Sequence, residues 1–434
     1  MIHDARTTGR WAACLAIGVA LSFGTPNTNA ADHSFAGPPQ LAALVSEALA
    51  NNPEIAAARS ELDAARQRVG PAGALEDPML EAGIINAPLD SLSLRREEMT
   101  MKMLGLGQKL PFPGKRDLRR AVATADAESI DRAVQETVNR VVRDVRFTFE
   151  ELAFNAEAQR IILRTRAELE QLAAIASSRY DVGQAVQNDV LDAQTEIEQL
   201  GVRLLRLVRN DAVLQSEMRR LLGRTDPAVP ISIMAQQLAA GPELETGLVT
   251  LAMGSRPQLQ ALQALVDRND KALDLAQREY YPDFDLKLQY GQRDRSPDGM
   301  PRDDMVSLIV GINLPIWRKS RLEPQVAEAR AMRNQAQSML AAQQLETRAA
   351  LDAQLAQVRQ WRATAELYQR TLLPQVRASV TSALAAYRVG RVDFLTLRQA
   401  QLREFEVSTD LAEAIANHNK ALAEIDLLVG HGVP

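Results

Sequence analysis

The 434-residue sequence has one cysteine, four histidines and few aromatic residues, which make up 4% of the chain. Cys14 lies in an N-terminal apolar run that we expect to be removed, so the mature chain would have neither a disulfide nor a lipid-bearing cysteine. Few aromatic residues beside abundant alanine, leucine, glutamine, arginine and glutamate are typical of long helices. One large globular core is therefore not expected.

The sequence also lacks the marks of an enzyme or of a nucleic-acid-binding protein. His33, His418 and His431 have no metal-ligand spacing, and we find no nucleophile motif or glycine-rich phosphate loop. The net charge of −5 comes from both signs interspersed along the chain, without a basic stripe. We therefore expect no catalysis, no cofactor and no nucleic-acid partner.

Residues 1–30 have the layout of a secretory signal peptide. Arg6 and Arg10 precede an apolar run from Trp11 to Phe23, and Thr28-Asn29-Ala30 offers a small-residue cleavage site. The run is about thirteen residues long, whereas a membrane-spanning helix needs ~20. Export with cleavage is thus favoured over a membrane anchor.

The spacing of prolines indicates a tandem duplication. An offset of 204 residues relates three pairs, namely Pro53 and Pro257, Pro78 and Pro282, and Pro111 and Pro315. The offset grows to 207 between Tyr180 and Tyr387, so three residues were gained within the second copy. We assign residues 31–223 to the first copy, 224–242 to a linker, and 243–434 to the second copy.

Each copy has the same predicted order of elements: short helices, a strand, a polar loop, a second strand and a long helical hairpin. Period-two alternation predicts the four strands, at 78–86, 99–110, 282–291 and 304–314. Apolar residues in steps of three and four predict the hairpins, at 115–222 and 319–430. The fold class is mainly α with a membrane β part. Gly70-Pro71 is expected to end a short helix, and Pro374 to kink or break a long one.

The hexapeptide Leu110-Pro111-Phe112-Pro113-Gly114-Lys115 predicts a joint between a strand and a helix. Pro111 and Pro113 confine the backbone to extended geometry, and Gly114 relaxes the turn so that a helix can begin at Lys115. Pro315 marks the corresponding joint in the second copy.

The strands have the pattern of transmembrane strands. Phe284, Leu286 and Leu288 alternate with Asp285 and Lys287, which gives one apolar and one charged face. A soluble sheet with one wet face is the alternative, but little apolar sequence remains elsewhere to cover it. Four strands do not close a barrel, so strands must be pooled between subunits. Two copies would supply about eight strands and three about twelve, and a water-filled pore favours the trimer.

The duplicated unit, the Leu-Pro-x-Pro-Gly-Lys joint and a Tyr-x-Val-Gly turn in each hairpin together resemble the TolC-like outer-membrane efflux proteins, over nearly the whole mature chain. The resemblance implies a homotrimer in the outer-membrane lipid, with a twelve-stranded barrel continued by a periplasmic helical tunnel. It implies a passive duct whose hairpin tips meet a periplasmic adaptor that links it to an inner-membrane pump. The tips are Val182, Gly183, Val389 and Gly390.

The resemblance also implies a channel gate near the tips. The family's Asp-Val-Leu-Asp motif stands here as Asp189-Val190-Leu191-Asp192 in the first copy, while the second copy has Thr396 and Gln399 at the matching positions. Further candidates for closing contacts are Tyr180, Asp181, Tyr387 and Arg388. The alternative is that all of these residues are helix-surface or capping residues beside a turn.

Met99, Met101 and Met103 alternate along a predicted strand. Strand parity with the second copy turns Met101 and Met103 toward the lumen and Lys102 toward lipid. Thioethers are soft ligands that suit Cu(I) or Ag(I), although lipid-facing bulk is the simpler explanation. No other metal site is expected.

The joint and the methionines are also similar to those of the heavy-metal-resistance branch of the family, so we favour metal cations over drugs as cargo. The alternatives are a drug or type I secretion duct of the same architecture, or a soluble periplasmic coiled-coil scaffold or adaptor.

Overall fold

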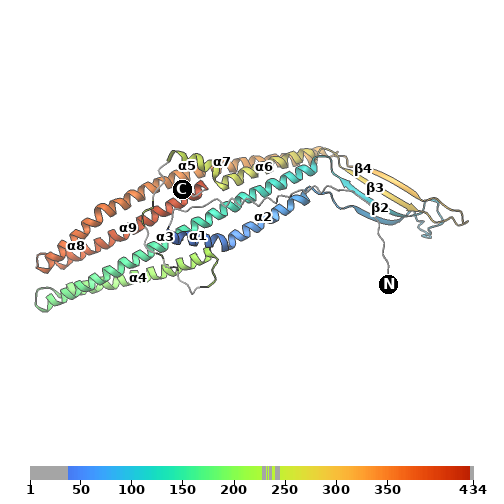
Figure 1. Cartoon of the computed structure of the whole chain (residues 1–434). Coiled ribbons are helices and arrows are strands. Elements are labelled where there is room, and N and C mark those ends of the chain that lie inside the picture. Colours follow the sequence, from blue (N-terminus) through green and yellow to red (C-terminus); the bar gives the residue numbers. More distant parts are fainter. Residues whose placement is uncertain (1–37, 227–230, 232, 234–236, 240–244, 431–434) are drawn as a thin grey trace, which may run out of the picture. The chain divides into compact units, whose positions relative to one another are not determined.

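The computed structural model describes residues 38–226, 231, 233, 237–239 and 245–430 (Figure 1). The expected signal peptide, 1–30, lies outside the described residues, as does much of the expected linker, 224–242.

The two copies have matching orders of helices and strands. The first copy contains α1 (Pro39–Asn51), α2 (Pro53–Ala72), β1 (Met79–Ile85), β2 (Met101–Leu110), α3 (Lys115–Asp181) and α4 (Gln187–Leu222). The second contains α5 (Glu245–Ser255), α6 (Pro257–Arg278), β3 (Phe284–Gln292), β4 (Met305–Ile312), α7 (Glu323–Leu367), α8 (Leu373–Arg388) and α9 (Phe394–Val429). The four strands and two long helical hairpins within the described residues confirm the expected fold class.

Two of the expected helix ends differ in detail from the structure. Helix α2 continues through Gly70 and Pro71 to Ala72 instead of ending there. Pro71 lies in the last turn of α2, where its missing N–H removes one hydrogen bond from the helix, and α2 ends at the next residue. The expected break at Pro374 takes the form of a π-helical segment, Tyr368–Leu372, directly before α8.

A second π-helical segment, Arg318–Leu322, opens the second long helix. A π-turn closes over one residue more than an α-turn. The two segments lie in the part of the second copy that is longer than its counterpart, and they accommodate part of that extra length. Helix α3 of the first copy has no such interruption over its 67 residues and would extend about 100 Å.

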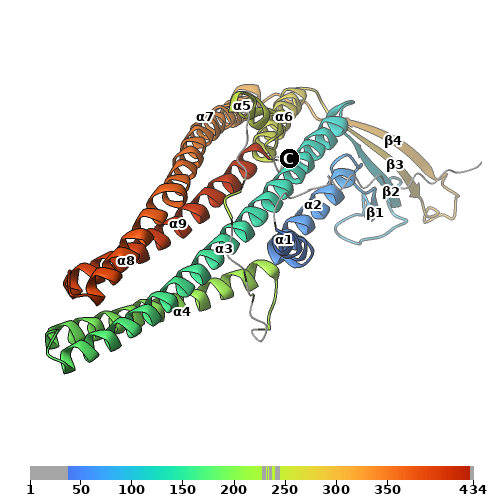
Figure 2. The ribbon, with the colours of Figure 1, turned by 60° about the vertical axis from the view of Figure 1, so that its left-hand side comes forward.

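Helix α3 is the longest helix of the described residues and packs against helices of both copies (Figure 2). It packs against α2, α4, α6 and α9, and so joins both copies along its length. One buried apolar cluster includes Val145 and Phe149 of α3 with Met218 of α4. A second cluster near the hairpin turns includes Leu169 of α3 and Leu397 of α9.

The strands form one antiparallel sheet in the order β1-β2-β3-β4. The central pairing, β2 with β3, joins the two copies, with Leu106 opposite Leu288. Among the described residues β1 and β4 are the edge strands. Figure 1 shows the sheet beyond the N-terminal end of α3 and the hairpin turns beyond its C-terminal end.

Candidate functional site

The two hairpin turns have the same backbone geometry. Gly183 and Gly390 adopt φ angles of +73° and +72°, in the left-handed region that favours glycine. The amide of Gly183 donates to the carbonyl of Tyr180 (2.9 Å), and the amide of Gly390 donates to the carbonyl of Tyr387 (3.0 Å). These contacts cap the ends of α3 and α8, and the positive φ explains why each turn ends in glycine. The intervening Val182 and Val389 are 66% and 68% exposed.

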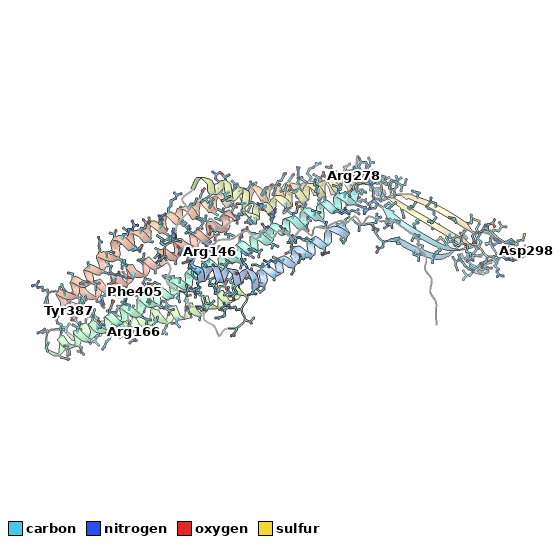
Figure 3. The ribbon with its side chains drawn as sticks, viewed as in Figure 1. Arg146, Arg166, Arg278, Asp298, Tyr387 and Phe405 are labelled. Atoms are coloured by element: carbon cyan, nitrogen blue, oxygen red, sulfur yellow. The ribbon has the colours of Figure 1, made fainter. Side chains whose placement is uncertain are left out.

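The tyrosines of the two turns have different environments. Tyr387 is 2% exposed, whereas Tyr180 is 45% exposed. The guanidinium of Arg179 lies 4.7 Å from the centre of the Tyr387 ring, and Arg179 also donates to the Tyr387 carbonyl. The ring of Phe394 on α9 meets Tyr387 edge-on, at 5.8 Å between centroids. Tyr387, which Figure 3 places at the hairpin end, therefore locks the first turn to the second.

Sequence reasoning missed Arg179. The residue directly precedes the Tyr-x-Val-Gly sequence of the first copy, and its counterpart in the second copy is Ala386. This difference between the copies was the available signal. Arg179 contacts Tyr387 of the second copy, and the side chain of Ala386 is too short to make an equivalent contact.

Asp189 and Asp192 are half-buried near the start of α4. Burial raises the pKa of the Asp189 carboxyl, as do the negative charges of Asp192 and Asp393, while Arg179 opposes the rise. Asp192 accepts from the side-chain amide of Asn188 at 3.3 Å. Three carboxylates thus gather at the junction of the two hairpins.

Two other residues proposed for the gate have exposed side chains. Asp181 and Arg388 are exposed at the ends of α3 and α8. Arg398 of α9 has a guanidinium nitrogen 3.9 Å from the Asp192 carboxylate, a charged contact between the hairpins that the sequence did not suggest.

The joint before α3 is a packed ionic cluster. Lys115 is 1% exposed, and its Nζ lies 2.9 Å from carboxylate oxygens of both Glu279 and Asp283. Asp283 also accepts from the backbone amide of Phe112 (2.8 Å). Burial opposes ionisation of Asp283, but Lys115 and the Phe112 amide together lower the pKa of its carboxyl. The joint therefore fastens β2 and α3 of the first copy to the start of β3 in the second.

The backbone conformation of Gly114 disfavours any residue with a side chain at this joint. Its φ is +90°, and a β-carbon there would lie 2.9 Å from Nη2 of Arg278. That arginine caps an aromatic pair, Phe112 stacked on Tyr281 at 4.7 Å between centroids. Pro111 lies in the short link after β2, but Pro113 forms a turn with Gly114, closed by the Lys115 amide donating to the Phe112 carbonyl (3.1 Å), and is not in the extended geometry expected for it. Figure 3 shows Arg278 where the helices meet the sheet.

The second joint differs from the first. Pro315 is followed by Ile316 and Trp317, which are 69% and 68% exposed. Lys319 occupies the position that corresponds to Lys115 and is exposed. The buried ionic cluster therefore belongs to the first joint.

The sheet has an apolar face that is exposed and a polar face that is partly covered. Leucine, isoleucine and valine side chains of the apolar face are 39% to 71% exposed; they are Leu80, Ile84, Leu104, Leu106, Leu286, Leu288, Val306, Leu308, Val310 and Ile312. On the other face Lys287 reaches Glu81 at 2.9 Å by passing over Gly107 of the intervening strand. This arrangement is the reverse of that in a soluble protein.

The register places Met101 and Met103 on the polar face with Glu81 and Lys287. Lys102 lies on the apolar face at the loop end of β2, where its Nζ is 3.2 Å from Asp294. The Asp294 carboxylate in the loop thus compensates the positive charge of Lys102, which the sequence predicts to face lipid.

No helix within the described residues is long and apolar enough to cross a membrane. Histidine, cysteine, aspartate and glutamate side chains form no group of three or more suited to a metal ion in the part of the chain that the structure describes.

A sheet with an apolar outer face, continued into long paired helical hairpins, defines a channel protomer of the outer membrane. The model of the outer membrane efflux protein family matches residues 44–224 and 248–431, so the chain belongs to this family. Members of the family are trimeric, non-enzymatic channels with a periplasmic helical tunnel, and they work with periplasmic adaptors and inner-membrane pumps.

Individual proteins show the same likeness. The chain is 24% identical to the cobalt-zinc-cadmium resistance protein CzcC of Cupriavidus metallidurans, over 96% of this chain and 99% of that protein. The structure matches VceC of Vibrio cholerae with a TM-score of 0.77 at 17% identity, covering 91% of this chain and 96% of VceC. It matches CusC with a TM-score of 0.77 at 15% identity, covering 91% and 92% of the two chains.

Proposed function

We propose that three copies of this chain form a passive outer-membrane exit channel for heavy-metal cations, coupled to an inner-membrane pump by a periplasmic adaptor. The observation that carries the membrane channel is the exposed apolar face of the sheet. Val306 and Leu308 alone are 71% and 68% exposed. A soluble scaffold or adaptor would have to leave this whole face in water, which is unfavourable at about 25 cal/mol per Å².

The edges of the sheet support assembly from several copies. Backbone groups of β1 and β4 that face away from the sheet need partners, because an unpaired group in hydrocarbon costs several kcal/mol. Pairing β4 of one copy with β1 of the next closes the sheet. Three copies supply about twelve strands, enough to surround water, whereas about eight would be filled by their own side chains.

The helices offer a matching pair of lateral surfaces. Helix α4 exposes Val202, Leu205 and Val213, and α7 exposes Met332 and Leu345, each at least 50% accessible. Helices α3 and α9 pack against each other within the chain. Since α3 and α9 hold the two hairpins of one chain together, the exposed apolar residues of α4 and α7 remain for contact between chains. We expect α4 of one copy to meet α7 of the next around a closed ring.

The hairpin tips form the entrance in this proposal. Asp189 and Asp192 would each contribute a ring of three carboxylates, a constriction that attracts cations. The exposed Val182 and Val389, held out by Gly183 and Gly390, are proposed contacts for the adaptor.

Metal cargo rests on the relationship to CzcC, a protein named for cobalt, zinc and cadmium resistance. The test is to delete the gene and compare tolerance to cobalt, zinc, cadmium, copper and silver with tolerance to drugs, before and after complementation. We expect loss of metal tolerance. Unchanged metal tolerance beside a drug defect would refute the metal cargo and favour a drug duct of the same architecture.

The gate is tested by the double variant Asp189→Ala, Asp192→Ala in planar bilayers. We expect a higher single-channel conductance, because six carboxylates that narrow the entrance are removed per trimer. Glu198→Ala removes an exposed carboxylate further along α4 and serves as the control. Equal conductance of the double variant and the wild type would leave the aspartates as surface residues.

A further inference from the structure

Three methionines gather around one glycine on the polar face of the sheet. Met103 of β2 is directly opposite Gly291 of β3, and Gly291 is directly opposite Met305 of β4. Met101, two residues before Met103, extends its side chain across Gly291, since a β-carbon built on that glycine would overlap the Met101 sulfur. The glycine therefore leaves a gap in the side-chain layer that Met101 occupies, with Met103 and Met305 on either side.

The distribution of methionine over the two faces argues against simple apolar filling. The strands contain four methionines, Met79, Met101, Met103 and Met305, and the register places all of them on the face of Glu81 and Lys287. The apolar face is built mainly from leucine, valine, isoleucine and aromatic residues and has no methionine, whereas the other face carries Ile85 and Ile309 beside the methionines. Methionine on the lipid side would be ordinary bulk, but here it occupies the side that faces water in a closed channel.

The cluster has the chemistry of a soft-metal site. Thioether sulfur prefers Cu(I) and Ag(I), and these ions accept three sulfur ligands without a charged donor. Met101 and Met103 are half-buried and Met305 is 38% exposed, so the sulfurs are within reach of an ion in the lumen. The methionines lie at the starts of β2 and β4 and beside the end of β3. These strand ends point toward the loop that carries Asp298, away from the helices (Figure 3).

We propose that Met101, Met103 and Met305 form a binding site for a soft monovalent metal ion, Cu(I) or Ag(I), near the outer mouth of the channel. The proposal rests on the proposed function in requiring that the polar face line a lumen, and it adds a cargo class that differs from the divalent ions for which CzcC is named. One site per copy places nine thioethers in a ring. An ion leaves such a neutral site easily, as an exit path requires.

The experiment is a titration of the untagged, detergent-solubilised trimer with silver nitrate in chloride-free buffer, followed by calorimetry and by X-ray absorption at the silver edge. We expect about three Ag(I) per trimer in sulfur coordination, following from one three-thioether site per copy. The triple variant Met101→Leu, Met103→Leu, Met305→Leu should lose this binding. Leucine conserves volume, so the variant should remain a trimer.

Two further variants keep the test decisive. Met339→Leu removes an exposed methionine of α7, and this variant should bind silver as the wild type does. Met305→Leu alone changes one edge-strand ligand and should weaken binding at least tenfold, even if the triple variant fails to assemble. Equal silver binding by the wild type and by Met305→Leu, or sulfur coordination lost in the α7 variant instead, would overturn the proposal.

Failure of the metal site and failure of the metal duct have different readouts. Metal tolerance that survives gene deletion would refute the proposed function, whatever the silver titration gives. Tolerance that is lost on deletion and fully restored by the triple variant, together with unchanged silver binding by that variant, would refute the methionine site alone.

Discussion

Glu150 is a carboxylate whose burial makes the stability of the helical part depend on pH. The residue lies on α3 and is 6% exposed. Its Oε2 accepts from the side-chain amide of Asn419 on α9 at 3.1 Å. Burial raises its pKa from 4.5 to about 7, against the opposing influence of the Asn419 hydrogen bond and of the charges on Arg146 and Lys420. Figure 3 places Arg146 midway along the helices.

The size and sign of the effect follow from this shift. A pKa difference of about 2.5 units corresponds to about 3 kcal/mol. The folded chain binds the proton more tightly than the unfolded chain, so this stability is fully present below the unfolded pKa of 4.5 and is lost as pH rises through about 7. Glu150→Gln keeps an acceptor for Asn419 without the charge. We expect the variant to exceed the wild type in free energy of unfolding by about 3 kcal/mol at about pH 8, and by little at about pH 5.

The assay is guanidinium denaturation of the solubilised protein, with helix content followed by circular dichroism at both pH values. Glu170→Gln, which removes a carboxylate from an exposed ion pair with Arg166 on the same helix, is the control and should shift neither midpoint by much. An equal difference in free energy of unfolding between Glu150→Gln and the wild type at both pH values would refute a role for ionisation of Glu150.

Three further predictions concern the joint, the sheet and the tips. Lys115→Met should leave Asp283 without a cation in contact and Glu279 with Arg119 alone, and it should cost about 3 kcal/mol, seen as earlier heat dissociation of the trimer on gels. Gly107→Val should fill the gap that Lys287 crosses and reduce the yield of assembled trimer in outer-membrane fractions, whereas a drop in soluble protein only would contradict this. Arg179→Ala should expose Tyr387 and speed proteolysis at the hairpin turns, and unchanged cleavage would show that the arginine does not hold them together.

Much of the fold was predictable because its signals are local. Period-two alternation gives strand β3 from Phe284 to Gln292, next to the expected range 282–291. Helix α3 begins at Lys115, where the proline and glycine chemistry of the joint predicts it. Because the chain is duplicated, each helix and strand could be predicted from two segments of the sequence.

Contacts between distant residues were not predictable in the same way. Nothing near Lys115 shows that its partners are Glu279 and Asp283, more than 160 residues further along. The two Tyr-x-Val-Gly turns are locally equivalent, yet Tyr387 is buried and Tyr180 is not, because only Tyr387 meets Arg179 and the other hairpin. Local sequence determines the turn, and the packing of one copy on the other determines the role of its tyrosine.

This asymmetry leads to a test that separates packing from gating at Tyr387. The Tyr387 hydroxyl is buried and has no hydrogen-bond partner within the described residues, and burial together with the nearby Asp189 charge raises its pKa. If the ring holds the tips together, Tyr387→Phe should conduct like the wild type and be no less stable, because it removes an unpaired hydroxyl.

Tyr387→Ala should destabilise the tips by about 3 kcal/mol through the cavity it leaves, and it should raise conductance. Tyr180→Ala, at a 45% exposed site, is the matched control and should change both properties little. If Tyr387→Phe instead opened the channel as far as Tyr387→Ala, the hydroxyl rather than the ring would be the closing group, and a partner for it would have to come from a neighbouring copy.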